Sequence, residues 1–410
     1  MGVPSLELSP EPARDRADRS LRVLCVGNIY PPQSPGGGYE LTWESSVSQL
    51  RDAGHTVRVL ASDHAEPGVH EPDVEDVHRD LRWYWREHAF PRRPLREVLD
   101  LERWNADVLN RHLATFAPDA VCWWGMGGMS LALVERVRRA GIPAVGVVGD
   151  EWLNWGPRVD GWLRRFRGRP RAARLAERLG GVPASVRLED GVVWLFGSEH
   201  LRRRALAEWP LADARVAHPG IDDSLFRRAA AAETWSWQLL YLGRLDPRKG
   251  VDLAVEALEH LPAEASLLLQ GAGEQAYVAE LERRGGPRLR FSREPREALP
   301  QVYGAADAVV FPVQWEEPWG LVPLEAMAMG RPVVASGTGG GREYMRHEHN
   351  CLIYEPRNSA EALAGALRRL AGDPALRDRL RAGGFETAAR YTETLYNEAI
   401  EAALLEVVPA

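Results

Sequence analysis

The chain has 410 residues, more than a single hydrophobic core normally serves, so two domains are expected. Apolar residues make up 45% and charged residues 27%, proportions that exclude a disordered or fibrous protein. The 51 basic and 58 acidic residues give a net charge of −7, which argues against a nucleic-acid partner. No run approaches the roughly 18 apolar residues of an integral membrane segment.

The amino-terminal segment is rich in Pro, Glu, Arg and Asp, which predicts a disordered tail over residues 1–20 and no signal peptide. Cys25, Cys122 and Cys351 show no paired spacing and lie in or beside apolar runs. We therefore expect small buried side chains at these positions, without a disulfide framework or a zinc site. A reducing, cytoplasmic location is the simplest expectation.

Residues 21–222 alternate short apolar runs with loops, which predicts a doubly wound α/β domain. A Gly-rich loop ending at Gly37 and Gly38 follows the first predicted strand, and glycine there would let the backbone approach a ligand. Three glycines alone are a weak signal. Predicted strands cover residues 22–27, 55–61, 120–124, 144–148, 191–196 and 215–218.

Tryptophans gather in the loops after the third and fourth of these strands, where open α/β sheets bind ligands. Stacking in a ligand pocket and packing in the core are both open explanations for them. The residues concerned are Trp123, Trp124, Trp152 and Trp155. Arginine clusters at 158–174 and 202–204, either as a solvated helix face or as a contact with anionic lipid or an acidic acceptor.

Residues 223–385 repeat the α/β pattern, and a hinge is expected near 222–235. A helix at 386–407 is long enough to cross back to the first domain. Predicted strands cover 239–242, 266–270, 288–291 and 308–311, and predicted helices cover 251–261, 360–370 and 375–383.

The stretch from Phe311 to Glu343 is the most informative. A helix is predicted to start between Gly320 and Val322 and to end at Gly330, with Pro323 in its first turn. Free N–H groups at such a start suit an anion. Glu317 and Glu325 flank this start, where they would either face sugar hydroxyls or remain solvated acids that favour the helix dipole.

The run Glu317-Pro-Trp-Gly-Leu-Val-Pro-Leu-Glu325, followed by Gly330-Arg-Pro-Val-Val-Ala and Gly339-Gly340, resembles the signature of glycosyltransferase family 4. Gly243-Arg-Leu-Asp-Pro-Arg-Lys-Gly250 is similar to the GRLxxxKG element of that family. The resemblance implies a retaining, nucleotide-sugar-dependent transferase of GT-B fold. Two Rossmann-like domains would then face each other across a cleft, with the acceptor on the N-terminal domain and the nucleotide sugar on the C-terminal one.

The resemblance also assigns roles. Arg244 and Lys249 would hold the donor diphosphate, a task for which cationic donors are suited, and Lys249 is the only lysine in the chain. Glu317 would bind the donor sugar and Glu325 the ribose, without a metal or a cofactor. The implied donor-binding set is Gly37, Gly38, Gly243, Gly273, Arg293, Gly320, Leu321, Val322 and Glu325.

One position departs from the family pattern. Many members carry a histidine that touches the donor sugar where this chain has Gly149. Asp150 or Glu151 is a candidate substitute, and Asp150 joins Arg244, Lys249 and Glu317 in the predicted catalytic set.

The leading prediction is transfer to a sugar, small-molecule or lipid-linked acceptor, with a natural-product-like acceptor suggested by the Trp-rich loops. A sugar-nucleotide epimerase of GT-B fold and an inactive glycan-binding homologue are the alternatives. An NAD-dependent oxidoreductase is disfavoured because GxGxxG is missing after the first strand. The residues leave the oligomeric state and a peripheral membrane contact open.

Overall fold

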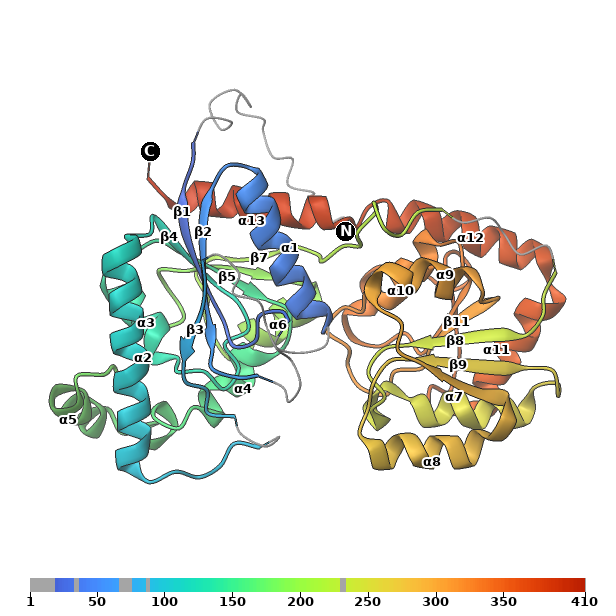
Figure 1. Cartoon of the computed structure of the whole chain (residues 1–410), viewed down its shortest axis with the longest axis horizontal. Coiled ribbons are helices and arrows are strands. Elements are labelled where there is room, and N and C mark those ends of the chain that lie inside the picture. Colours follow the sequence, from blue (N-terminus) through green and yellow to red (C-terminus); the bar gives the residue numbers. More distant parts are fainter. Residues whose placement is uncertain (1–18, 33–36, 66–75, 86–88, 229–233, 410) are drawn as a thin grey trace.

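The computed structural model describes residues 19–409 apart from 33–36, 66–75, 86–88 and 229–233. These residues form two α/β domains that lie side by side (Figure 1). The tail predicted over 1–20 falls almost wholly outside the described residues, as does the middle of the predicted hinge.

The N-terminal domain is built on a parallel sheet whose described strands follow the order β3-β2-β1-β4-β5-β6-β7. β1 lies in the middle because four of its five residues are apolar and fully buried. Its Cys25 lies opposite Cys122 on β4, and all three cysteines are free and buried, as predicted. The strands are β1 (Arg22–Val26), β2 (Thr56–Ser62), β3 (Val77–Leu81), β4 (Ala120–Trp123), β5 (Ala144–Val148), β6 (Val193–Phe196) and β7 (Ala214–Val216).

Helices cover both faces of this sheet. The sequence analysis predicts neither α2 nor β3, although Val98, Leu101 and Val108 occur at helical spacing and are buried in α2. The helices are α1 (Gly38–Asp52), α2 (Leu95–Phe116), α3 (Ala132–Arg139), α4 (Trp152–Val159), α5 (Pro170–Gly180) and α6 (Glu199–Leu206).

The C-terminal domain contains a second parallel sheet, with described strands in the order β10-β9-β8-β11-β12-β13. Its strands are β8 (Gln238–Leu242), β9 (Ser266–Gln270), β10 (Leu289–Ser292), β11 (Ala308–Phe311), β12 (Val333–Ala335) and β13 (Leu352–Ile353). Its helices are α7 (Val251–Ala257), α8 (Gln275–Gly285), α9 (Leu299–Gly304), α10 (Val322–Ala328), α11 (Ala360–Gly372) and α12 (Pro374–Ala388). The strands at 239–242, 266–270, 288–291 and 308–311 are therefore confirmed to within two residues.

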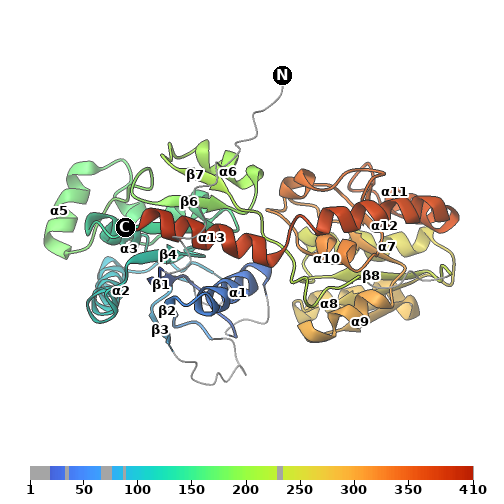
Figure 2. The same cartoon turned by 90° about the horizontal axis from the view of Figure 1, so that it is seen from above.

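The chain returns to the N-terminal domain through α13 (Glu393–Val407). The helix predicted at 386–407 is in fact divided, since Glu386 belongs to α12 and Thr392 caps a new helix by accepting from the Leu395 N–H. The buried side chains Tyr396, Ile400 and Leu404 pack into the core of the first sheet. Figure 2 shows α13 lying along the N-terminal domain while α12 stays on the C-terminal one.

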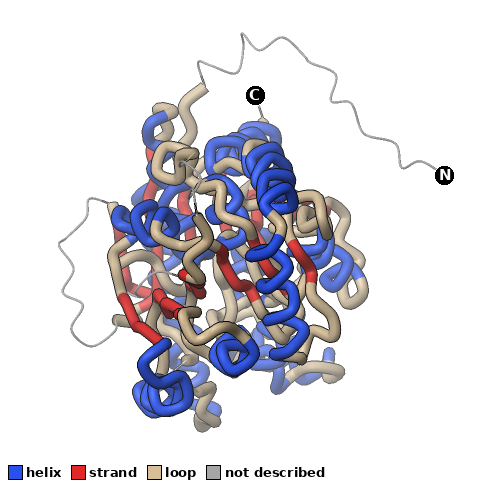
Figure 3. Tube along the Cα trace, turned by 90° about the vertical axis from the view of Figure 1, so that its right-hand side faces the viewer, coloured by secondary structure: helices blue, strands red, loops and turns tan. Residues whose placement is uncertain are grey.

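The two crossings between the domains lie against each other. The Ile221 N–H donates to the Tyr391 carbonyl at 3.0 Å, and the Glu393 N–H donates to the Ile221 carbonyl at 2.8 Å. Viewed along its length, the molecule shows the helices stacked around the strands (Figure 3). Within the described residues, no helix is both long and apolar enough to cross a membrane.

Both sheets have the doubly wound order, with a switch point between β1 and β4 in one domain and between β8 and β11 in the other. Ligands of open α/β sheets bind in the crevice beyond the carboxyl ends of the strands at such points. The two Rossmann-like domains predicted from the sequence are thus confirmed, and the loops that follow these four strands are where a site is expected.

Candidate active site

The loops after β8 and β11 meet at the switch point of the C-terminal domain. Lys249 ends the first loop, and its Nζ donates to Glu317 Oε2 at 2.6 Å. The same oxygen accepts from Trp315 Nε1, also at 2.6 Å. Both charged side chains are largely shielded, with 19% of Lys249 and 12% of Glu317 exposed. The structure therefore brings two of the predicted catalytic residues into direct contact.

The second predicted cation, Arg244, has a different environment. Arg244 is 62% exposed, and its Nε lies 3.7 Å from Asp246 Oδ2. Its positive charge also reaches Glu40 in α1 of the other domain: burial raises the pKa of Glu40, and Arg244 lowers it in part. Arg244 thus lies on the side of the C-terminal domain that faces α1.

The backbone behind Glu317 is supported by the glycine-rich segment that the sequence analysis singled out. The Gly340 N–H donates to the Glu317 carbonyl at 2.8 Å. A Cβ on Gly339 would lie 2.1 Å from the Glu317 carbonyl oxygen, and one on Gly340 would lie 2.0 Å from that of Pro318. Only glycine permits this approach, so these two positions hold the loop that carries Glu317.

Helix α10 begins where predicted, with Leu321 as its cap residue and Pro323 in the first turn. Gly320 adopts φ +91°, and its carbonyl accepts from the Tyr344 hydroxyl at 2.6 Å. A Cβ on Gly38 would lie 3.5 Å from Leu321 Cδ1. The Gly37–Gly38 loop of the first domain and the start of α10 therefore meet across the two domains, although their sequence separation is large.

Glu325 lies one turn into α10 and is 5% exposed. Its Oε2 accepts from the Tyr303 hydroxyl at 2.6 Å. Burial raises the pKa of Glu325, while the Tyr303 hydrogen bond and the Arg296 charge partly oppose that rise. The Tyr303 contact was not anticipated from the sequence, and the ribose role of Glu325 stays a prediction.

The remaining donor-binding candidates lie at the ends of β8, β9 and β10. Gly243 donates its N–H to the Gln270 carbonyl at 3.0 Å, and Leu245 pairs with Gly273 in an isolated parallel bridge. These glycines let two loops run side by side. Arg293 is exposed just after β10. Their contact with a nucleotide base stays a prediction.

The backbone at position 149 leaves no room for a side chain. A Cβ on Gly149 would lie 2.4 Å from Tyr39 Cδ2, because the Tyr39 ring fills the space beside this backbone. The Tyr39 hydroxyl donates to the Val147 carbonyl at 2.5 Å. Tyr39 follows the Gly37–Gly38 loop, and its role was missed because no local pattern connects it to β5.

Asp150 follows Gly149 and is partly buried. Its Oδ1 accepts from the Trp152 N–H at 2.8 Å. Burial raises the pKa of Asp150 to about 7, and the negative charges of Glu40 and Glu151 add to the rise. A carboxyl group with such a pKa exchanges a proton near neutral pH, which suits contact with a reacting hydroxyl.

Asp150 lines a cavity of about 490 Å³ between the two domains, which we call the aromatic cavity. Its lining residues are Asn28, Trp83, Trp85, Phe90, Gly127, Asp150, Glu151, Trp155, Arg248, Trp315 and Pro318. Of the four tryptophans considered from the sequence, Trp155 lines the cavity, whereas Trp123, Trp124 and Trp152 are buried in the core. Trp83, Trp85, Phe90 and Trp315 were not predicted to contribute.

The cavity adjoins the charged pair through Trp315. The indole N–H of Trp315 binds Glu317, and Lys249 Nζ lies 5.3 Å from the centre of the same ring. Among the described residues, His78, Asp80 and His112 are the one group able to hold a metal ion, with ligand atoms within 4.8 Å of one another. They belong to β3 and α2 and do not line the cavity.

Comparison with solved structures identifies the fold. A sucrose-phosphate synthase from Thermosynechococcus elongatus superposes with a TM-score of 0.69 and 20% identity, covering 95% of this chain and 99% of that one. Anabaena HepE, solved in complex with UDP, gives a TM-score of 0.68 and 20% identity over 94% of this chain and 100% of its own. The two-domain fold is GT-B, as the sequence analysis predicted.

Sequence comparison agrees. Residues 223–387 match the family model described as glycosyl transferases group 1. A D-inositol 3-phosphate glycosyltransferase from Xylanimonas cellulosilytica is 37% identical over 222 residues, covering 51% of this chain and 52% of the relative. A glycogen synthase from Mycobacterium tuberculosis is 29% identical over 392 residues, or 88% of each chain. Residues 223–387 therefore resemble the glycosyl transferases of group 1, and the whole chain has the GT-B fold.

Proposed function

We propose that this protein is a retaining glycosyltransferase that moves a sugar from a nucleoside-diphosphate sugar to a small-molecule acceptor. The observation that carries the proposal is the Lys249–Glu317 contact, which joins the two motif loops beside the aromatic cavity. Complexes of Anabaena HepE with UDP and with UDP-glucose, proteins of the same fold, support a nucleotide-sugar donor.

Binding of the donor places the two cationic side chains beside the diphosphate, where the C–O bond breaks. The diphosphate takes up negative charge as it leaves, so Lys249 and Arg244 stabilise it more strongly in the transition state than in the ground state. Glu317 accepts a hydrogen bond from the Lys249 ammonium at 2.6 Å and balances its charge. The bound diphosphate competes for this ammonium, and Glu317 then accepts hydrogen bonds from the donor sugar. The second oxygen of Glu325 serves the ribose.

In the transfer step, the bond between the anomeric carbon and the phosphate oxygen breaks, and the acceptor oxygen bonds to the same face of that carbon. The acceptor hydroxyl gives its proton to the leaving phosphate oxygen. This route requires neither a metal nor a carboxylate nucleophile on the opposite face. Asp150 lies in the cavity wall, where its carboxyl group orients the acceptor hydroxyl by a hydrogen bond.

The aromatic cavity supports an acceptor with an apolar or aromatic part. Its volume falls within the roughly 300–1,000 Å³ of small-molecule sites. Several of its polar groups are already engaged: Trp83 Nε1 donates to the Gly127 carbonyl at 2.9 Å, and Trp315 Nε1 donates to Glu317. The Trp83 and Trp315 indoles therefore offer ring faces to a ligand and not their N–H groups.

The donor proposal is tested with a panel of UDP-, GDP-, ADP- and dTDP-sugars, following sugar-dependent release of nucleotide. We expect release from at least one donor, and Glu317→Gln should keep nucleotide binding by calorimetry while losing turnover. An inactive glycan-binding homologue predicts no release from any donor. Tight binding of NAD would instead support the oxidoreductase hypothesis.

The acceptor proposal has its own test. Phe90→Ala and Trp155→Ala should raise the acceptor KM while leaving acceptor-independent donor hydrolysis unchanged. Trp104→Ala is the matched control, because Trp104 is 43% exposed on α2 and does not line the cavity. Equal effects of all three substitutions would show that the cavity does not hold the acceptor.

A further inference from the structure

Helix α5 lies at the end of the N-terminal domain that is farthest from the C-terminal domain in both Figure 1 and Figure 2. Ala173 and Gly180 are buried against the domain. Leu175 and Leu179, four residues apart and hence on one helix face, are 59% and 73% exposed. Two neighbouring leucines with this exposure are an apolar patch with no cover in the described part of the chain.

Positive charge surrounds this patch. Five exposed arginines lie in or just before α5: Arg167, Arg169, Arg171, Arg174 and Arg178. Between residues 161 and 188 the sequence contains a single acidic residue, Glu177. A chain with a net charge of −7 therefore concentrates cations at this end. The combination of exposed leucines and arginines is typical of helices that lie in a membrane interface.

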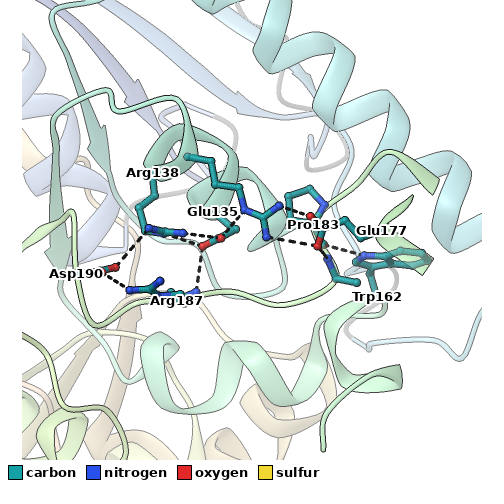
Figure 4. Close-up of polar contacts among 9 residues, drawn as sticks. Glu135, Arg138, Trp162, Glu177, Pro183, Arg187 and Asp190 are labelled. Carbon is teal, nitrogen blue, oxygen red and sulfur yellow. Dashed lines mark hydrogen bonds and ion pairs between the residues drawn. The ribbon is translucent and has the colours of Figure 1, made fainter. Parts of the chain in front are cut away.

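The inner face of α5 is fixed to the domain, as Figure 4 shows. Glu177 forms an ion pair with Arg139 of α3. Trp162, which precedes α5, donates from Nε1 to the Pro183 carbonyl, which follows it, at 2.9 Å. Arg103 Nε of α2 donates to the Gly180 carbonyl at 3.0 Å. Because these contacts turn Glu177 inward, the opposite face with its leucines is held outward without a rearrangement of the helix.

We propose that α5 docks the protein on an anionic lipid surface, with Leu175 and Leu179 inserted between the head groups and the arginines paired with lipid phosphates. An acidic polymer would bind the arginines but would gain nothing from two exposed leucines. None of the residues that line the aromatic cavity belongs to α5, so docking leaves the cavity accessible. The proposal is independent of the transferase reaction.

Co-sedimentation with phosphatidylcholine vesicles, with and without phosphatidylglycerol, tests it. The full chain should bind only the anionic vesicles, and high salt should release it. Arg171→Gln/Arg174→Gln/Arg178→Gln should weaken binding roughly a hundredfold, since each cation near an anionic surface contributes about fivefold. Leu175→Ser/Leu179→Ser should weaken it by roughly tenfold or more.

Two control variants make equal changes elsewhere. Arg283→Gln/Arg290→Gln/Arg379→Gln removes three exposed charges from the C-terminal domain, and Leu95→Ser/Leu395→Ser removes two leucines that are 52% and 51% exposed. Both should bind vesicles like the unaltered chain. Absence of binding by the unaltered chain, or equal losses in test and control variants, would overturn the proposal. The proposal would also be overturned if the chain bound both heparin and vesicles and the α5 leucine substitutions changed neither binding.

Discussion

The packing of Tyr39 against Gly149 makes a sharp prediction about stability. In Gly149→Ala the new Cβ would lie 2.4 Å from Tyr39 Cδ2, well inside van der Waals contact. Forcing this partly buried ring aside costs about 1–3 kcal/mol. Loss of the hydrogen bond from the Tyr39 hydroxyl to the Val147 carbonyl adds about 0.5–1.5 kcal/mol. We therefore expect a destabilisation of about 2–4 kcal/mol.

Scanning calorimetry measures this effect as a lower Tm. For a unit of about 150–250 residues, 1 kcal/mol corresponds to about 2–4 °C, so the loss should reach at least about 4 °C. Gly156→Ala in α4 is the matched control, because its Cβ would meet nothing closer than 3.7 Å. A helical glycine replaced by alanine with room to spare should leave Tm unchanged or raise it.

A double-mutant cycle identifies the cause. In a Tyr39→Ala background the ring is gone, so adding Gly149→Ala should cost less than about 0.5 kcal/mol. Tyr39→Phe separates the hydrogen bond from the ring, since it removes only the hydroxyl. If Gly149→Ala costs as much in the Tyr39→Ala background as in the unaltered chain, the steric explanation for the missing histidine is refuted.

Three further predictions concern the site. Lys249→Ala should lower the rate of sugar-dependent nucleotide release by roughly a hundredfold. Since Lys249 is the only lysine, amine-selective acylation should inactivate the unaltered enzyme, and nucleotide sugar should protect it. Inactivation without modification of Lys249 in the peptide map would contradict this role. Burial raises the pKa of Asp150 from 3.8 to about 7, so the stability from its protonation is present below pH 4 and is lost as the pH rises through 7. Asp150→Asn should therefore gain Tm relative to the unaltered chain between pH 5 and pH 8, and a constant difference would exclude the shift. Tyr303→Phe should lower the free energy of unfolding by about 1–3 kcal/mol, because it leaves the buried Glu325 carboxyl group without its hydrogen-bond donor. It should also weaken nucleotide binding in calorimetry. An unchanged Tm would show that water replaces the hydroxyl.

The C-terminal half of the site was the more predictable one, for a physical reason. Lys249, Glu317 and the start of α10 come from two contiguous stretches, each a strand followed by a loop at one sheet edge. The spacing of residues along each stretch therefore predicts most of the geometry of this half of the site. The strand at 308–311 was placed to the residue, and α10 starts within the predicted range 320–322, because apolar runs and a first-turn proline are local signals.

The N-terminal half was predicted less well because its parts come together only in the folded chain. Trp83 and Phe90 line one cavity with Trp155, although α2, β4, α3 and β5 lie between Phe90 and Trp155 in the sequence. β3 was missed because it is an edge strand whose residues are mostly half-buried, so its sequence, VHRDL, lacks an apolar run. Tyr39 was missed because only the fold brings α1 against the end of β5.

Trp315 connects these two halves. One edge of its indole donates to Glu317, which is also bound to Lys249, while the residue lines the aromatic cavity together with side chains of the other domain. A ligand that stacks on this ring therefore acts on the same residue that fixes the Glu317 carboxylate. Because Glu317 can face Lys249 or a donor sugar, the position of Trp315 affects both. Under the proposed function, Trp315 therefore links the donor region to the acceptor region through one side chain.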